Sequence, residues 1–256
     1  MNLTALAAFS DNYIWMIDDG QRAIVVDPGE SGPVEAALDA RRLELVGILL
    51  THHHADHVGG VDALRSRLNG PVFGPAREKV PQPCIGLREG ETAEVLGLRF
   101  EVLDVPAHTA GHIAYVSPEG AGDPIVFCGD TMFSAGCGKL FEGTAEQMYA
   151  SLGKLAALPD ATRVCCGHEY TLSNLRFAQA VEPGNSDVRE HTARSQALRD
   201  EGEPTLPSTV GRERLINPFL RCGEPAVIAA ARAHGAPDTG GSEVLAALRT
   251  WKNDFR

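Results

Sequence analysis

The chain has 256 residues, of which 43% are hydrophobic and 22% charged, a composition typical of an ordinary globular protein with one large core. Its formal net charge of −11 argues against nucleic-acid or anionic-membrane partners, because no broad cationic field is present. The sequence contains neither a recognisable signal peptide nor an apolar run of the ~18 residues that a membrane span needs. The six cysteines are scattered without CxxC spacing, so we expect free thiols in a reduced, cytoplasmic protein.

The first part of the chain predicts a β-meander followed by alternating helices and strands. Turn sequences at residues 10–12 and 18–20 separate short runs of alternating apolar residues. In chain order, the pattern predicts strands at 3–8, 13–17 and 22–26, a helix at 33–42, a strand at 45–50, a helix at 58–68 and a strand at 71–74. The proline-rich residues 75–91 are predicted to form a loop.

A second meander starts near Ala93 and leads into a helical C-terminal part. The pattern predicts strands at 98–105, 113–116, 125–128 and 163–166, with a helix at 144–157 that begins at a capping box of Thr144 and Gln147. Beyond residue 170 no strand pattern recurs; helices are predicted at 172–181, 187–199, 224–234 and 242–252, with a loop at 204–217. We therefore expect two domains, 1–170 and 171–256, the first an αββα sandwich of the α/β (α+β) class.

The stretch after the strand at 45–50 is rich in metal ligands. His52 and His54 are two residues apart in an extended segment, so they face the same way and could share one metal. Asp56 and His57 stand where a helix begins and could serve a neighbouring metal. A surface histidine cluster or a single structural metal are the alternatives, but structural zinc sites usually close themselves with four ligands, often cysteines.

Three further candidate ligands, His108, Asp130 and His168, each follow directly after a predicted strand, where layered α/β folds build their sites. Asp130 stands alone in its loop behind Gly129, so its two carboxylate oxygens are the natural bridge between two ions. Two metals ~3.5–4 Å apart can share a water, lower its pKa towards ~7 and polarise a carbonyl. The pattern therefore predicts hydrolysis of an activated acyl bond by a metal-bridging hydroxide. His53, by alternation, should face away from the ligands, and His112 could support them.

These motifs resemble those of a known family. The pattern Thr-His-x-His-x-Asp-His at residues 51–57, followed by the three ligands above, resembles the metallo-β-lactamase superfamily. Within it, nearly the whole chain resembles glyoxalase II, the hydroxyacylglutathione hydrolase family. The segments that carry this resemblance are residues 10–13, 129–133, 136–139, 141–144, 166–171, 181–185, 204–209, 217–219 and 248–252.

The resemblance implies an αββα metallo-β-lactamase sandwich with a C-terminal helical domain, in agreement with the predicted elements. It also implies two divalent metal ions, with Zn²⁺ favoured and iron or manganese as alternatives. One metal would be bound by His52, His54 and His108, the second by Asp56, His57 and His168, with Asp130 as the bridge. Asp56 and Asp130, together with the bridging hydroxide, would be the catalytic groups.

The implied substrate is S-D-lactoylglutathione, which is cleaved to D-lactate and glutathione in the second step of methylglyoxal detoxification. By resemblance, glutathione would be bound by Lys139, Tyr170, Arg249 and Lys252, and its carboxylates suit lysine and arginine. For Arg249 and Lys252 the alternative is a pair of solvated cations near a helix C-terminus. Family members often carry tyrosine at the position of Phe141, so we expect one hydroxyl contact to be missing and substrate binding to be weaker or altered.

Other functions are known for this fold, and the sequence features described above favour or disfavour each of them. A mononuclear-iron glutathione persulfide dioxygenase would need fewer metal ligands and would not need Arg249 and Lys252. A metal-dependent nuclease is disfavoured by the acidic charge and the lack of a basic stripe. A purely metal-binding module is the remaining alternative. Nothing in the sequence indicates obligate dimerisation, so we expect a monomer.

Overall fold

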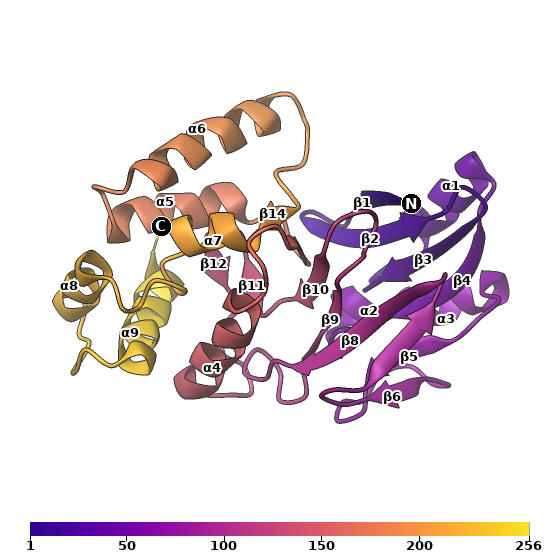
Figure 1. The fold of residues 1–256 in the computed structure, drawn as a ribbon, viewed down its shortest axis with the longest axis horizontal. Coiled ribbons are helices and arrows are strands. Elements are labelled where there is room, and N and C mark those ends of the chain that lie inside the picture. Colours follow the sequence, from indigo (N-terminus) through magenta and orange to yellow (C-terminus); the bar gives the residue numbers. More distant parts are fainter. Residues whose placement is uncertain (256) are drawn as a thin grey trace.

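The computed structural model describes residues 1–255 and contains two six-stranded sheets packed face to face (Figure 1). The first sheet consists of β1 (Asn2–Ala8), β2 (Asn12–Asp18), β3 (Arg22–Val26), β4 (Glu44–Leu49), β5 (Val72–Pro75) and β6 (Ile85–Leu87), in that spatial order. The second consists of β7 (Thr92–Val95), β8 (Leu98–Asp104), β9 (Ile113–Ser117), β10 (Ile125–Gly129), β13 (Arg163–Cys166) and β14 (Ser208–Thr209). Its spatial order is β14-β13-β10-β9-β8-β7, and β11 (Met132–Phe133) and β12 (Gly136–Cys137) form a separate hairpin.

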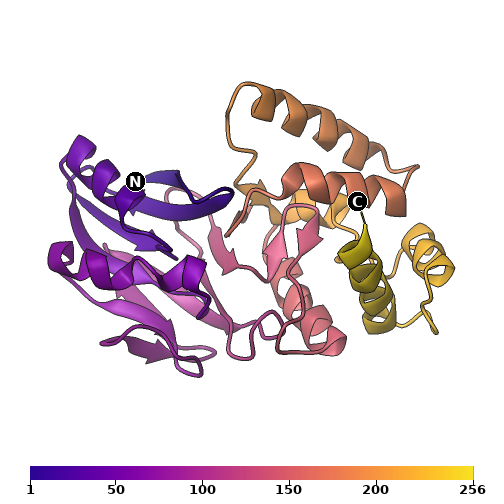
Figure 2. The ribbon, with the colours of Figure 1, turned by 180° about the vertical axis from the view of Figure 1, so that it is seen from behind.

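The helices cover the outer faces of the sheets and extend the molecule at one end. The N-terminal half contributes α1 (Gly32–Arg41), α2 (Ala55–Val58), α3 (Val61–Leu64) and the 3₁₀ turn η1 (Arg65–Arg67). The C-terminal half contributes α4 (Ala145–Ala156), α5 (Thr171–Val181), α6 (Ser186–Asp200), α7 (Val210–Ile216), α8 (Pro225–Ala233) and α9 (Gly241–Asp254). Figures 1 and 2 both place α5–α9 at the opposite end of the molecule from α1.

Strand β2 illustrates how the sequence builds two apolar layers. Its side chains alternate between the two faces of the sheet. Tyr13, Trp15 and Ile17 belong to the core cluster that also contains the buried residues of the second sheet. Ile14 and Met16 belong to a second cluster, which contains the buried residues of α1 and α3. Every residue of β2 is therefore buried, as expected for the middle layer of a sandwich.

The helical C-terminal region shares its core with the second sheet. Phe177 of α5, Val227 of α8 and Leu248 of α9 belong to the same cluster as Phe127 of β10 and Leu152 of α4. Burying these side chains on one another removes their apolar surface from water, which stabilises the contact by about 25 cal/mol per Å². Among residues 1–255, no helix combines the length and apolar character needed to cross a membrane.

The architecture confirms the predicted αββα sandwich with a helical C-terminal region, and it corrects three details. The predicted loop at 75–91 contains β6. The predicted helix at 58–68 is divided into α2, α3 and η1, because Gly59 and Gly60 pack directly against the loop at residues 28–30; a Cβ on Gly60 would lie 2.5 Å from the carbonyl carbon of Glu30.

The expectation that no strand follows residue 170 is wrong. The predicted loop at 204–217 contains α7 and the edge strand β14, which pairs antiparallel with β13 through Val164 and Ser208. A two-residue strand is too short to produce a period-two pattern in the sequence, so only its pairing reveals it.

The sheet topology brings the C-terminal ends of several strands together. Strands β10 and β13 are parallel, and β8 and β10 each pair antiparallel with β9, so β8, β10 and β13 all run in the same direction. The loops that follow these three strands therefore emerge at the same end of the second sheet, where the C-terminal ends of the strands lie. These loops contain His108, Asp130 and His168.

Candidate active site

Asp27, at the end of β3, anchors the histidine-rich loop that follows β4. Thr51 donates its backbone N–H to Asp27 Oδ1 at 2.8 Å and its hydroxyl to Asp27 Oδ2 at 2.6 Å. The Nδ1 atom of His57 lies 3.1 Å from the same Oδ2. A proton on Nδ1 that donates to Asp27 leaves the lone pair of Nε2 available for a metal. The sequence analysis assigned no role to Asp27.

Three imidazoles converge on one side of the site. The Nδ1 atom of His54 lies 3.2 Å from His52 Nε2 and 3.1 Å from His108 Nε2. His52 and His54 come from the loop after β4 in the first sheet, whereas His108 comes from the loop after β8 in the second. These three residues form the first triad, and each offers one ligand atom within 4.8 Å of the others.

The second triad combines one carboxylate with two imidazoles. The Oδ2 atom of Asp56 lies 3.5 Å from His57 Nε2 and 3.4 Å from His168 Nε2. The side chain of Asn12 donates to the same Oδ2 at 3.0 Å and so holds the carboxylate in place. The second triad matches the predicted ligand set of Asp56, His57 and His168.

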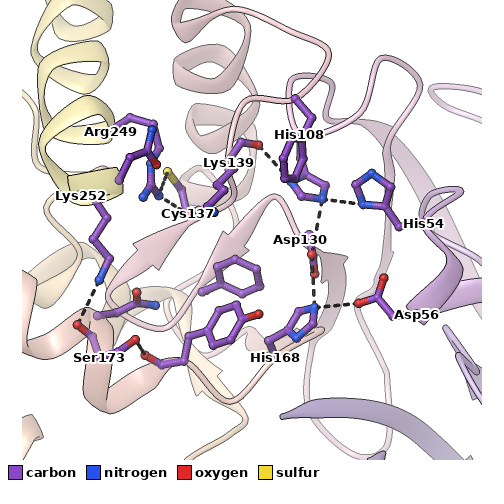
Figure 3. A pocket seen from close by; sticks show the side chains of 15 residues that line it. His54, Asp56, His108, Asp130, Cys137, Lys139, His168, Ser173, Arg249 and Lys252 are labelled. Atoms are coloured by element: carbon purple, nitrogen blue, oxygen red, sulfur yellow. Dashed lines mark hydrogen bonds and ion pairs between the residues drawn. The ribbon is translucent and has the colours of Figure 1, made fainter. Parts of the chain in front are cut away.

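Asp130 lies between the two triads (Figure 3). Its Oδ2 atom is 3.4 Å from His108 Nε2 and 3.3 Å from His168 Nε2, and its Oδ1 atom is 3.4 Å from His57 Nε2. The preceding Gly129 has φ +47°, and a Cβ there would lie 2.3 Å from Thr51 Oγ1, so this turn requires glycine. All seven predicted metal ligands are thus brought together.

The spacing and chemistry of these atoms suit two divalent metal ions. Ligands at the ~2.0–2.2 Å bond lengths of a tetrahedral zinc site lie roughly 3.3–3.5 Å apart. The nearest ligand-to-ligand distances in the two triads run from 3.1 Å to 3.5 Å. In addition, His57 Nε2 and Asp130 Oδ1 are buried and have no hydrogen-bond partner among residues 1–255. Imidazole and carboxylate donors together suit zinc, iron or manganese.

Hydrogen bonds behind the triads orient two further imidazoles. His108 Nδ1 donates to the backbone carbonyl of Lys139 at 3.0 Å, and His168 Nδ1 lies 2.8 Å from Asp11 Oδ1. Such bonds fix the ring orientation and turn Nε2 towards the metal position. Asp11 belongs to the turn between β1 and β2, and the sequence analysis identified it only as part of a family-like segment.

The remaining two histidines of the region are not placed among the seven ligands. His112 stacks on His52 with ring centroids 4.5 Å apart, and its Nε2 accepts the backbone N–H of Asp130 at 3.2 Å. His53 points away from the triads, as expected from alternation, and its Nδ1 lies 3.0 Å from Glu78 Oε2. His112 therefore supports a ligand loop, whereas His53 contacts a different loop.

Carboxylates favour the protonated form of the two imidazoles in the second triad, whereas burial lowers the pKa of His52, His54 and His108 in the first triad. Burial by itself would lower the pKa of His57, but Asp130, Asp27 and Asp56 hold that pKa well above its ordinary value. Burial likewise opposes protonation of His168, yet Asp130 and Asp56 raise its pKa to about 10. The negative charge of the same carboxylates would also favour the binding of divalent cations.

A cavity of about 640 Å³ opens next to the two triads. It is lined by His54, Asp56, His108, Asp130 and His168 and also by the four predicted substrate-binding residues, Lys139, Tyr170, Arg249 and Lys252. Figure 3 shows Arg249 and Lys252 on the opposite side of the cavity from His54 and Asp56. This volume is within the ~300–1,000 Å³ of small-molecule pockets. The structure therefore brings the predicted metal ligands and the predicted substrate residues to one cavity.

Two cations of α9 enter the cavity wall from the same helix face. Arg249 is only 7% exposed, donates from Nη1 to the Cys137 carbonyl at 2.8 Å and lies 5.4 Å from the Phe219 ring centroid. Lys252 donates from Nζ to the Ser173 carbonyl at 3.1 Å, and burial lowers its pKa to about 8, with Arg249 as a further cause. The alternative of two solvated helix-end cations therefore does not hold for Arg249.

Aromatic side chains form the rest of the cavity near the triads. The Tyr170 ring stacks on the His168 ring, with centroids 4.7 Å apart and planes at 7°. Phe141 is 62% exposed and presents its ring at centroid distances of 5.6 Å from His54 and 5.3 Å from His108. Phe133 and Asn174 also line the cavity. Phe133 belongs to a family-like segment of the sequence, whereas no sequence pattern identifies Asn174.

Comparisons with known proteins agree with the fold and the site. Residues 8–168 match the family model of the metallo-β-lactamase superfamily, and residues 169–255 match the model described as hydroxyacylglutathione hydrolase C-terminus. A relative from Albidiferax ferrireducens, named hydroxyacylglutathione hydrolase, is 56% identical over 255 residues, covering all of both chains.

Two solved structures extend this similarity. ETHE1 from Myxococcus xanthus is 25% identical and has a TM-score of 0.66, with 100% of each chain covered. TTHA1623 in a di-iron-bound form is 28% identical and has a TM-score of 0.59, covering 86% of this chain and 100% of that one. With both family models matched and the full length shared with a close relative, the chain belongs to the hydroxyacylglutathione hydrolase family of the metallo-β-lactamase superfamily.

Proposed function

We propose that the chain hydrolyses 2-hydroxyacyl thioesters of glutathione, with S-D-lactoylglutathione as the substrate and D-lactate and glutathione as the products. This reaction is the second step of methylglyoxal detoxification. The observation that carries the proposal is the position of Asp130, whose carboxylate lies between both triads and faces the same cavity as Lys139 and Lys252. The name of the relative that shares the full chain length supports the same substrate class.

The seven ligands would hold two divalent metal ions, one in each triad, with Asp130 contacting both. Zn²⁺ is our first candidate, with iron or manganese as alternatives, and the di-iron form of TTHA1623 supports a two-metal site on this fold. Two adjacent ions, when bound, lower the pKa of a shared water towards ~7 and polarise the thioester carbonyl.

The side chains of the protein bind and orient the two reactants. Asp56 and Asp130 lie at the centre of the site, and the hydrogen bonds that His57 donates to Asp27 and His168 donates to Asp11 keep these two imidazoles in place. Hydrolysis adds the oxygen of one water to the acyl carbon, and the C–S bond breaks as the sulfur leaves as a thiolate. Since a thiolate is a good leaving group, a strong general acid is less necessary than for an amide.

The far wall of the cavity would recognise the glutathione part. Glutathione carries two carboxylates, and Lys139, Arg249 and Lys252 supply cations that can pair with them. Burial raises the pKa of Tyr170, with Asp11, Asp130 and Asp56 as further causes, so its hydroxyl stays protonated and can donate a hydrogen bond. The contacts of Arg249 and Lys252 would be remote from the reacting carbonyl, so they would bind substrate and transition state alike.

The two domains would have different roles. Residues 1–170 would form the catalytic domain, which contains every proposed metal ligand, and residues 171–256 would form the helical domain, which contributes Arg249 and Lys252. All six cysteines are free thiols, which supports a reduced, cytoplasmic location. We propose a monomer as the working form.

The decisive experiment combines metal analysis with two substrates. The metal-loaded protein should contain two ions per chain and hydrolyse S-D-lactoylglutathione with a much lower KM than S-D-lactoyl-N-acetylcysteamine, a thioester that lacks the glutathione carboxylates. Equal KM values would contradict the assignment of glutathione as the recognised group, whereas hydrolysis of both thioesters would still show that the protein is a thioester hydrolase. One iron per chain with oxygen consumption on glutathione persulfide would instead establish the dioxygenase alternative.

A further inference from the structure

A second cavity, of about 170 Å³, lies in the helical region between α6, the segment before β14, and α7 (labelled in Figure 1). Its polar lining consists of His191, Arg194, Thr205, Ser208, Thr209 and Arg212. Among the described residues, it shares no lining residue with the cavity of the active site. The function proposed above assigns no role to this second cavity.

His191 is a buried polar residue of the second cavity whose ring has no partner among the described residues. The residue is 9% exposed, and neither of its ring nitrogens has a hydrogen-bond partner among residues 1–255. A neutral imidazole carries one N–H donor and one acceptor, and buried polar atoms of folded proteins are nearly always paired. The imidazole of His191 is therefore available to a ligand in the cavity.

Two guanidinium groups accompany His191. Within residues 1–255, the side chain of Arg194 has no ion pair or hydrogen bond, and the side chain of Arg212 has only Asp187, at 4.0 Å from its Nη1 atom. Both groups are close enough to His191 to disfavour its protonation: burial and then the charges of Arg212 and Arg194 lower the pKa of His191 to about 4. The cavity is therefore locally positive, in a chain whose net charge is −11.

The hydroxyl groups of the lining are already engaged with the protein. Ser208 donates to Glu213, Thr205 donates to Glu169, and Thr209 Oγ1 accepts the backbone N–H of Arg212 at 3.2 Å. The groups without such partners are thus the two guanidiniums and the imidazole. All three can donate to one anion, since arginine offers a planar fork of N–H groups and His191 can offer an N–H.

We propose that this second cavity binds a tetrahedral oxyanion of the phosphate class, held by Arg194, Arg212 and His191. The cavity is smaller than the ~300 Å³ at which pockets for drug-sized ligands begin, so it would enclose a phosphate group and leave any larger substituent outside. The bound charge would compensate the two guanidiniums and supply an acceptor for the N–H of the imidazole. This site does not depend on the proposed thioesterase function.

The site can be tested on the metal-loaded protein by following the ring resonances of His191 by NMR during titration with inorganic phosphate at constant ionic strength. The signal is identified by its loss in His191→Gln. This readout separates the second cavity from phosphate bound at the metal ions. We expect saturable movement of the His191 signal, with a Kd at least about tenfold weaker in Arg194→Ala and in Arg212→Ala.

Arg232 of α8 provides the matched control, because it is exposed and does not line the second cavity. Arg232→Ala removes the same charge and should change the Kd less than twofold. Arg194 is also exposed, so its substitution should leave the fold intact. A His191 signal that does not move with phosphate, or one that responds equally in the Arg194 and Arg232 variants, would overturn the proposal.

Further titrations define the ligand. Sulfate should compete with phosphate, whereas acetate should bind more weakly because it is planar and carries one charge; equally tight acetate binding would refute the tetrahedral class. Glycerol 3-phosphate distinguishes the two sources of the group. Binding tighter than that of inorganic phosphate would indicate a phosphate monoester as the ligand, and weaker binding would indicate the free anion.

Discussion

The Nε2 atom of His57 and the Oδ1 atom of Asp130 lie 3.4 Å apart, and both are buried without a hydrogen-bond partner among residues 1–255. His57 lies in α2, which comes after β4 of the first sheet, and Asp130 directly follows β10 of the second sheet. A metal ion bound by both residues would therefore join the two sheets. Without metal, only the ion pair between these two buried side chains would remain at this position, and the other candidate ligands would lose the cation that they face.

Metal removal should accordingly destabilise the protein. A ligand present at ~100 times its Kd contributes about 2.7 kcal/mol to the folded state. For a chain of this size, that corresponds to a fall in Tm of roughly 5–10 °C. Calorimetry before and after treatment with a chelator measures the change, and addition of the metal should restore the original Tm. An unchanged Tm would contradict a link between the sheets through metal.

Asp130→Asn tests the bridging role. The amide keeps the size of the side chain but loses its charge and one of its two acceptor oxygens, so it cannot serve both triads equally. We expect loss of bound metal together with a fall in kcat/KM of more than about 100-fold. Metal content and hydrolysis are measured on the same sample, with the exposed Asp123→Asn as the control. Two retained metals per chain would argue against the bridge.

Gly167→Ala tests the close packing behind the metal ligands. A Cβ at this position would lie 2.6 Å from Asp130 Oδ1 and 2.6 Å from His57 Cε1, so both ligands must shift. We expect metal affinity to fall by at least about tenfold. Gly184→Ala is the matched control, because its Cβ would meet no atom within 4 Å. Similar metal affinities of the two variants, measured by competition with a chromogenic chelator, would refute this constraint.

Lys252 should make substrate binding depend on pH. Burial, with Arg249 and Arg176 nearby, lowers its pKa to about 8, so the side chain is charged below this pH and neutral above it. Because a glutathione carboxylate pairs with the charged form, we expect KM to rise as the pH increases through about 8. In Lys252→Arg the rise should disappear, since a guanidinium stays charged.

Lys252→Ala should raise KM at every pH and change kcat much less, because the contact is remote from the carbonyl. Lys79→Ala, which removes an exposed lysine that does not line the cavity, should leave both constants unchanged. Equal losses in kcat and kcat/KM for Lys252→Ala would show that Lys252 does more than bind the substrate.

Phe141→Tyr should improve substrate binding. The ring is 62% exposed at the edge of the cavity, so a hydroxyl can be added there without a steric or desolvation cost. A net hydrogen bond of about 0.5–1.5 kcal/mol to glutathione would lower KM roughly 2–10-fold at constant kcat. Phe9→Tyr, at another exposed ring, serves as the control. A KM that does not fall would mean that the hydroxyl finds no partner on the substrate.

The candidate ligands could be predicted because their signal is local. Each follows an apolar run that reads as a strand, and the strand ends at the same position in the structure to within a few residues. Alternation in the extended loop placed His52 and His54 on one side and His53 on the other. A local pattern could not predict β14, because two residues are too few to show the alternation of apolar and polar side chains that marks a strand. This strand is defined only by its pairing with β13.

The groups that orient the ligands could not be predicted, because their partners are far away in the sequence. Asp11 contacts His168 across 157 positions, and Asp27 contacts His57 across 30. The positively charged cavity at His191 likewise depends on α6, α7 and the segment between them, which no single stretch of sequence reveals.

The sequence by itself therefore predicted the fold class and the seven candidate metal ligands, because strand ends and ligand spacing are encoded over a few neighbouring residues. The division of the ligands into two complete sets and the choice of the substrate residues rested on the resemblance to the glyoxalase II family. Only the tertiary structure decided that Asp130 lies between the two triads, that Asp27 and Asp11 hold the imidazoles, and that Arg249 is buried in the cavity wall. These relationships follow from the packing of two sheets and a helical region, and packing brings together residues whose separation along the chain leaves no local signal.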